Sequence, residues 1–174
     1  MWPKSSLSFS YATPRPLEII SGGSTSSLPL LAHGGMPPGV NQLRLGEALV
    51  VPCDLIDYWR CPLPGLSNAG LIFRAEIIEA GAKPSRPIGR MARDAFGNQR
   101  QFEDQGQRKR LLLAAGVFQA GDEQKLIPCD AGAKILGASS DHMIVDITDS
   151  CLDYRLGDSM AFQLHYKAML FLTA

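Results

Sequence analysis

The chain of 174 residues is 45% hydrophobic and 20% charged, which is typical of one globular domain, or of one domain plus a piece of another. Lysine plus arginine (17) balance aspartate plus glutamate (17), so no overall positive field favours nucleic acid or an anionic membrane surface. No apolar run approaches the roughly 20 residues of a membrane-spanning helix, and the N-terminus does not have the pattern of a secretory signal.

Changes in composition along the chain predict four parts. Serine and proline dominate the beginning, proline and glycine return near residue 60, and the spacing of apolar residues differs on the two sides of that region. The parts are an extended or disordered leader at 1–16, a βα segment at 17–51, an irregular linker at 52–68 and a β domain at 69–174.

The βα segment begins with an apolar run at 17–20, which is followed by a Ser-Gly-Gly turn at 21–23 and by four hydroxyl residues before Leu28. That order predicts a strand, a tight turn and the start of a helix. A second strand is predicted over residues 41–50, where Arg44 lies among apolar side chains.

The turn at 21–23 is a candidate phosphate site. A glycine pair lets the backbone approach an anion closely, and hydroxyls and the first N–H groups of a helix supply donors. A plain turn has the same composition, so the residues alone leave both interpretations open. A charge within an apolar run needs a reason, and for Arg44 the reason is either a ligand or an ion pair with a carboxylate such as Glu47.

Beyond residue 68 the apolar side chains repeat every second residue, as in strands. In 159–166, for example, Met160, Phe162, Leu164 and Tyr166 are expected to face inward and Ser159, Gln163 and His165 outward. Short strands at this spacing, separated by glycine-containing turns, predict a mostly β fold with an antiparallel barrel or sandwich. The expected strands are 71–79, 109–117, 125–128, 134–138, 142–148 and 159–166.

The four cysteines are interpreted as reduced thiols of a cytoplasmic protein. They show no Cys-x-x-Cys spacing, and no histidines are placed in the sequence to complete a zinc site. We therefore expect neither a metal site nor a disulfide at Cys53, Cys61, Cys129 and Cys151.

Three motifs together resemble one family: the turn at 21–23, Leu-Arg-Leu-Gly-Glu at 43–47 and Leu-Gly-Ala-Ser-Ser-Asp-His at 136–142. They are similar to the alanine-racemase-like family of pyridoxal-phosphate enzymes, specifically its ornithine-racemase-like branch. The resemblance implies an N-terminal (β/α)8 barrel followed by a C-terminal β domain. This chain would then hold the last two barrel strands, at 17–20 and 43–50, and nearly all of the β domain, whereas about six barrel strands are absent.

The resemblance also implies a cofactor site. The family would bind pyridoxal 5'-phosphate here, with a hydroxyl from Thr25 and N–H groups from Gly46 and Glu47 on the phosphate. Arg44 would lie beside the pyridine nitrogen. The full set of expected cofactor contacts is Ser24, Thr25, Ser26, Arg44, Gly46 and Glu47.

Two catalytic groups of the family have no counterpart in this sequence. The lysine that forms the Schiff base belongs to the first barrel strand, but Lys4 lies in the leader and the other lysines lie in the β-domain region. The tyrosine that a partner's β domain supplies would fall within 83–97, which contains no tyrosine. The catalytic residues are therefore unknown, and we expect the chain alone to be inactive.

Ser140, Asp141 and His142 align with the loop that contacts substrate in the neighbouring subunit of alanine racemases. An N–H, a hydroxyl and a carboxylate suit the termini of an amino acid, and the carboxylate also suits a cationic side chain. Without the resemblance, a turn in which Asp141 caps the following strand fits equally well.

The sequence thus predicts the C-terminal part of a pyridoxal-phosphate amino-acid racemase. It would act on an amino acid as a homodimer or with a partner chain that carries the missing barrel half. The alternative is a self-standing β-domain module for binding or oligomerisation, without chemistry.

Overall fold

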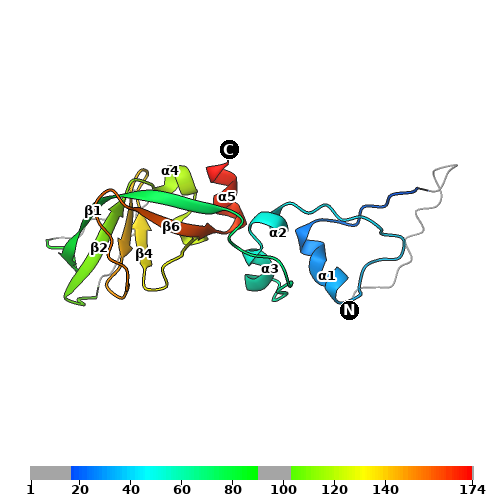
Figure 1. The fold of residues 1–174 in the computed structure, drawn as a ribbon, viewed down its shortest axis with the longest axis horizontal. Coiled ribbons are helices and arrows are strands. Elements are labelled where there is room, and N and C mark those ends of the chain that lie inside the picture. The colour runs from blue at the N-terminus through cyan, green and yellow to red at the C-terminus, as the bar shows by residue number, and fades with distance from the viewer. Residues whose placement is uncertain (1–16, 90–102, 174) are drawn as a thin grey trace.

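The computed structural model describes residues 17–89 and 103–173 (Figure 1). The predicted leader at 1–16 and most of the segment in which a partner tyrosine was sought lie outside these residues. The strands are β1 Ile72–Pro84, β2 Gln107–Leu113, β3 Leu126–Pro128, β4 Lys134–Ala138, β5 Met143–Asp146 and β6 Ser159–Leu164. The helices are η1 Thr25–Ser27, α1 Leu28–Ala32, α2 Glu47–Val50, α3 Cys53–Asp57, α4 Val117–Ala120, η2 Glu123–Lys125 and α5 Tyr166–Leu172.

The strands form one antiparallel sheet in the order β3-β6-β1-β2-β5-β4. The long strand β1 pairs with β6 through its first half and with β2 through its second half, and its register shifts between Ile77 and Glu79. A bulge of this kind bends a strand and increases its twist. The sheet curls into a nearly closed barrel at one end of the molecule (Figure 1), which confirms the predicted fold class.

The alternating pattern of β6 is reflected in its burial. Met160, Phe162 and Leu164 are buried in the main core, and Phe162 lies 6.1 Å from the Phe73 ring. The inward prediction for Tyr166 is wrong, because pairing with β3 ends at Leu164 and Tyr166 begins α5, where it is exposed. Among the described residues, no helix is long and apolar enough to cross a bilayer.

Residues 17–57 contain two short βα elements. An isolated parallel bridge joins Ser21 to Gln42; η1 and α1 follow the first of these residues, and α2 follows the second. The predicted strands at 17–20 and 43–50 are wrong: the segment has only the isolated bridge between Ser21 and Gln42, and helix α2 begins at Glu47. Two neighbouring strands without a third form little regular sheet, which explains why only one bridge remains. A small core of Leu28, Ala48 and Leu55 packs beneath this segment.

The linker predicted at 52–68 is not irregular throughout, since it contains α3. Pro52 precedes that helix with φ −72°, close to the helical value. Leu55 of α3 is buried in the small core, so packing favours a helical turn that the proline and glycine content of the linker did not predict.

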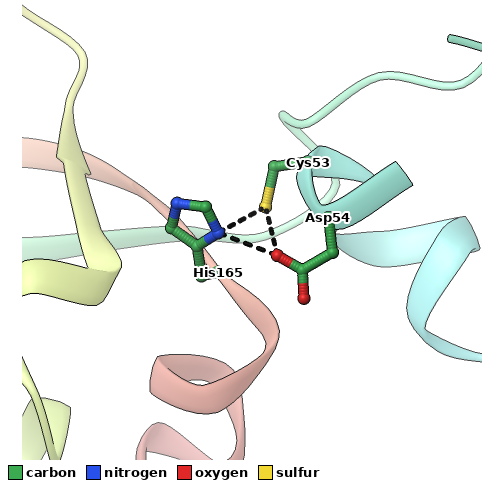
Figure 2. Close-up of side chains that lie close together, drawn as sticks. All are labelled: Cys53, Asp54 and His165. Atoms are coloured by element: carbon green, nitrogen blue, oxygen red, sulfur yellow. Dashed lines mark hydrogen bonds and ion pairs between the residues drawn. The ribbon is translucent and has the colours of Figure 1, made fainter. Parts of the chain in front are cut away.

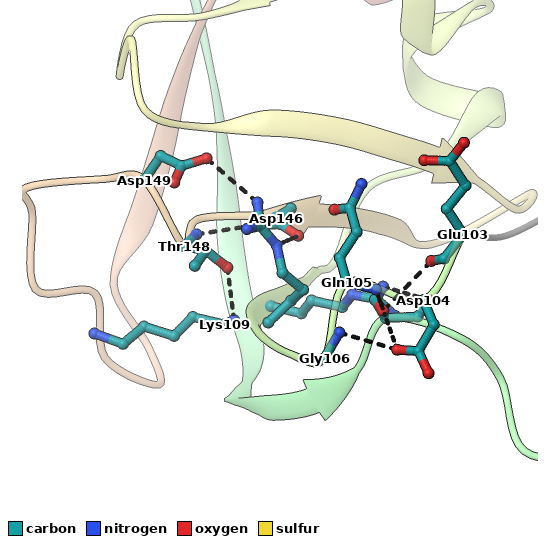
Figure 3. A network of polar contacts seen from close by, with 11 residues as sticks. Glu103, Asp104, Gln105, Gly106, Lys109, Asp146, Thr148 and Asp149 are labelled. Carbon is teal, nitrogen blue, oxygen red and sulfur yellow. Dashed lines mark hydrogen bonds and ion pairs between the residues drawn. The ribbon is translucent and has the colours of Figure 1, made fainter.

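A polar network surrounds the buried carboxylate of Asp146 (Figure 3). Arg108 Nε donates to Asp146 Oδ2 at 3.0 Å, and the backbone N–H of Thr148 donates to Oδ1 at 2.9 Å. Burial alone would raise the pKa of Asp146, but these hydrogen bonds outweigh it and hold the pKa below its usual value.

The Asp146 network predicts how stability depends on pH. Because the pKa of Asp146 is lowered in the folded state, the ionised carboxylate stabilises the fold fully above the unfolded-state pKa of about 3.9. This stabilisation is lost as pH falls through the folded-state pKa. In urea denaturation, Asp146→Asn should be less stable than the native protein near neutral pH. It should also lose less stability than the native protein as pH falls below about 5. Asp149→Asn, whose side chain is 76% exposed, should keep the native slope. Equal slopes in Asp146→Asn and the native protein would contradict the assignment.

Candidate functional site

The two turns predicted to bind a cofactor lie side by side. Besides the Ser21–Gln42 bridge, the N–H of Gly22 donates to the carbonyl of Gln42 at 2.9 Å. One step further, the N–H of Arg44 donates to the carbonyl of Gly23, also at 2.9 Å. The backbone therefore places the glycine turn next to the run that begins at Arg44, although the two are some twenty residues apart in sequence. We name residues 21–27 and 42–48 together the paired turns.

The glycines of the first turn are required by close approaches. A Cβ on Gly22 would lie 2.2 Å from Cγ1 of Val40, and one on Gly23 would lie 2.1 Å from Oγ of Ser27. Gly23 also has φ +136°, a conformation that side chains disfavour. By contrast, a Cβ on Gly46 in the second turn would meet nothing within 4 Å, so that backbone faces open space.

Thr25 connects the paired turns through its side chain. It is only 5% exposed, and its Oγ1 accepts a hydrogen bond of 3.1 Å from the backbone N–H of Ala48. Ser24 and Ser26 are exposed and share a hydrogen bond of 3.3 Å between their hydroxyls. The structure thus brings all three predicted hydroxyl residues to one place, with Thr25 fixing the spacing and the two serines facing solvent.

Arg44 is exposed, and no ion pair in the described segments involves it. The alternative explanation of the Arg44 charge, an ion pair with Glu47, is therefore not observed in the structure. Glu47 is partly buried, and its pKa is raised by desolvation and by the nearby carboxylate of Asp54. Arg44 is consequently available to an external partner.

The second predicted set lies in the turn between β4 and β5. The Ser140 hydroxyl donates to Asp141 Oδ2 at 2.6 Å, and the N–H of His142 donates to Oγ of Ser139 at 3.1 Å. The carbonyls of Ser139 and Ser140 accept hydrogen bonds from Val117 and Phe118 at the start of α4. Asp141 and His142 are exposed on this supported turn.

The structure does not bring the two predicted sets together within one chain. Across 17–89 and 103–173, no hydrogen bond or ion pair connects residues 24–26 or 44–47 to residues 140–142. In Figure 1 the paired turns belong to the end that carries α1 and α2, whereas β4 and α4 belong to the barrel. A cavity of about 590 Å³ between β3 and β4 includes none of the predicted residues.

A third group, which the sequence did not predict, lies where α3 meets the end of β6 (Figure 2). His165 Nδ1 lies 2.8 Å from Asp54 Oδ1 and 3.4 Å from Cys53 Sγ. The Cys53 thiol also donates to the carbonyl of Leu164 at 3.2 Å. Burial, followed by the charges of Asp54 and Asp57, raises the pKa of this thiol to about 12.

Sequence reasoning missed this group for two reasons. The search for metal ligands used short Cys and His spacings, whereas Cys53 and His165 are separated by 112 positions. The alternation in β6 correctly places His165 on the face away from the barrel core, but alternation does not show what covers that face. The only local signal is the adjacent pair Cys53 and Asp54 after Pro52.

The chain is 42% identical over 154 residues to the ornithine racemase of Acetoanaerobium sticklandii and, over the same length, to the lysine racemase of Thermotoga maritima. Each match covers 88% of this chain. The chain is homologous to part of these amino-acid racemases. It spans less than half of their length, 43% of the ornithine racemase and 42% of the lysine racemase.

A solved structure with a similar fold is the D-threonine aldolase of Filomicrobium marinum, with a TM-score of 0.52. The similarity covers 88% of this racemase-related chain and 35% of the aldolase chain, at 18% identity, so it speaks for the fold alone. No family model matches the sequence.

The hydrogen bond from Ala48 to Thr25 gives a test of the paired turns. Thr25→Val keeps the shape but removes the acceptor, and an unpaired buried N–H costs on the order of 1–3 kcal/mol. Amide hydrogen exchange at Ala48 should become about tenfold faster or more in Thr25→Val. Thr25→Ser retains the hydroxyl and should exchange near the native rate. Equal rates in the valine and serine variants would show that this bond does not hold the turns together.

Proposed function

We propose that this chain is the C-terminal part of a pyridoxal-phosphate-dependent amino-acid racemase and contributes the phosphate cup and a β domain. The observation that carries the proposal is the pairing of the two turns, in a chain 42% identical to an ornithine racemase and a lysine racemase. The predicted hydroxyls, the open backbone at Gly46 and an exposed arginine lie in two turns that are held together by the Ser21–Gln42 bridge, by the backbone bond from Arg44 to Gly23 and by the bond from Ala48 N–H to the Thr25 side chain.

The residues of the paired turns fit an anionic cofactor. Ser24 and Ser26 offer exposed hydroxyl donors, and Gly46 and Glu47 offer backbone beside open space. Thr25 accepts from Ala48 through its oxygen, which leaves its hydroxyl hydrogen free to donate to a phosphate oxygen. When bound, pyridoxal phosphate withdraws electrons from the α-carbon of an amino acid and so makes its proton acidic.

Arg44 would act at the pyridine nitrogen of the cofactor. A guanidinium is charged at every physiological pH and can only donate, so it keeps that nitrogen unprotonated. By this contact Arg44 would favour return of the proton to the α-carbon over transamination. The absence of an ion pair to Arg44 within the described residues agrees with this role.

The turn at 140–142 would complete the site of another subunit. Because it has no polar contact with the paired turns of its own chain, contact with a substrate bound there requires a second copy or a partner chain. The named substrates of the two relatives, ornithine and lysine, both carry a cationic side chain. The exposed carboxylate of Asp141 suits such a side chain.

Catalysis would also require a lysine from outside this sequence, since none of its lysines falls at the position that the family uses. In this proposal the lysine-bearing barrel half joins the paired turns at the active site, and the assembly acts in the cytoplasm.

Binding by the chain alone can be tested with pyridoxamine phosphate, which cannot form a Schiff base and therefore reports only the cup and the ring contacts. Nuclear magnetic resonance should show amide shifts at residues 24–26 and 46–47. The shifts should be weaker in Arg44→Ala and unchanged in Arg74→Ala, which removes an exposed arginine of β1. Shifts located only in the barrel, or none, would contradict a phosphate cup here.

Activity can be tested by co-expression with the part of the Acetoanaerobium sticklandii ornithine racemase that this chain does not match. The assembly should convert L-ornithine to D-ornithine, whereas either part alone should not. Arg44→Ala should lower the rate on the order of 100-fold, as does loss of a preorganised electrostatic contact, and Arg74→Ala should not.

The rival assignment is a β-domain module without chemistry, which the separate core of the barrel supports. It predicts a folded chain that oligomerises through the barrel, shows no shifts with pyridoxamine phosphate and yields no racemase activity in the assembly.

A further inference from the structure

We propose that Cys53, Asp54 and His165 form a binding site for a zinc-like divalent cation that connects α3 to the end of β6. The Sγ, Oδ1 and Nδ1 atoms lie within 4.8 Å of one another and converge on one point (Figure 2). A thiolate, a carboxylate and an imidazole are the three ligand types that zinc prefers. This inference does not depend on the proposed racemase function.

The donor spacing fits a tetrahedral site. Ordinary zinc bond lengths place sulfur roughly 3.5 Å from either of the other donors, and nitrogen about 3.3 Å from oxygen. The observed separations are 3.4 Å for sulfur to nitrogen, 3.7 Å for sulfur to oxygen and 2.8 Å for nitrogen to oxygen. Only the nitrogen–oxygen pair must open, by about 0.5 Å, and water would supply the fourth ligand.

The same geometry argues against a nucleophilic triad. In a triad the histidine receives the nucleophile's proton at one ring nitrogen and is oriented by a carboxylate at the other. Here Asp54 Oδ1 lies closer to Nδ1 of His165, at 2.8 Å, than Cys53 Sγ does at 3.4 Å, and the carboxylate nearest Nε2, Asp57 Oδ2 at 3.7 Å, is beyond hydrogen-bond distance. Two groups that face one nitrogen cannot divide these roles, but they can share a cation.

The surroundings of His165 are those of a metal ligand. Its other nitrogen, Nε2, lies 3.7 Å from Asp57 Oδ2, and Tyr58 stacks on the ring with centroids 6.2 Å apart. A ligating histidine commonly directs its second ring N–H toward a carboxylate, which fixes the tautomer that leaves the first nitrogen free for metal. The two contacts hold Nδ1 toward Cys53 and Asp54.

The charge around the point is negative, although Lys125 interacts electrostatically with Asp54. Glu47, Asp54 and Asp57 surround it, and in the part of the chain that the structure describes no lysine or arginine forms an ion pair with any of them. Lys125 instead donates to the hydroxyl of Tyr58 at 3.1 Å. A divalent cation would offset this charge, and its binding would release the thiol proton of Cys53 to solvent.

The site would connect two parts of the fold, and its three protein ligands and one water would make it more open than a four-ligand structural zinc site. Cys53 and Asp54 belong to α3, whose Leu55 lies in the small core beside the paired turns, whereas His165 is the residue between β6 and α5 of the barrel. A bound cation would therefore fix the barrel relative to the paired turns.

The test uses the whole chain, first treated with a chelator and then titrated with Zn²⁺ by calorimetry. We expect one ion per chain and a higher melting temperature. With Co²⁺ we expect a thiolate-to-cobalt charge-transfer band and the visible bands of a tetrahedral site. Cys53→Ala should weaken binding at least tenfold and remove the charge-transfer band. His165→Gln should weaken binding at least tenfold and remove the tetrahedral bands. Cys61→Ala, which removes another buried cysteine of the same region, should bind as the native chain does.

A second measurement on the native chain does not depend on how the variants fold. Zn²⁺ should slow amide hydrogen exchange in α3 and around His165 and leave the exchange of β4 and β5 unchanged. Failure of the native chain to bind one ion, equal binding by Cys53→Ala, or equal loss in Cys61→Ala would overturn the proposal.

Discussion

The short parallel contact between Ser21 and Gln42 is the constraint on which the candidate site depends. In parallel strands the carboxyl ends meet at the same edge, so the turns after these two residues must lie together. The bridge alone is weak, since it is a single residue pair without neighbouring strands. The contacts from Arg44 to Gly23 and from Ala48 to Thr25 continue it into the turns and make their spacing definite.

The paired turns and the barrel are stabilised by different interactions. The barrel has its own core, in which Phe162, Ile77 and Leu113 are fully buried, whereas the paired turns rest on the small core around Ala48 and Leu55. Helix α3 contacts both, through Leu55 on one side and through Asp54 and His165 on the other. Val51, directly after α2, is also fully buried in the barrel core, so apolar packing as well as polar contacts sets the relative position of the two parts.

Much of the barrel was predictable because its signals are local. Residues 134–138 form β4 as expected, since alternation and the flanking glycines both act within a few residues. The pairing of the turns was predictable from the resemblance, and the structure places these segments together, while the roles of Arg44, Thr25 and Asp141 stay predictions. The errors arose where tertiary contacts decide. Glu47 begins a helix within a run whose composition favours a strand. Tyr166 begins α5 because the pairing of β6 with β3 ends at Leu164.

The group at Cys53 shows why such contacts escape sequence analysis. Nothing near His165 in the sequence indicates a partner, because the residues it meets come from a helix more than a hundred positions earlier. Its outward direction follows from alternation in β6, but the packing of α3 against that face converts an ordinary surface histidine into a partly buried one between two carboxylates. The geometry at Nδ1, where sulfur and oxygen both approach, favours a bound cation.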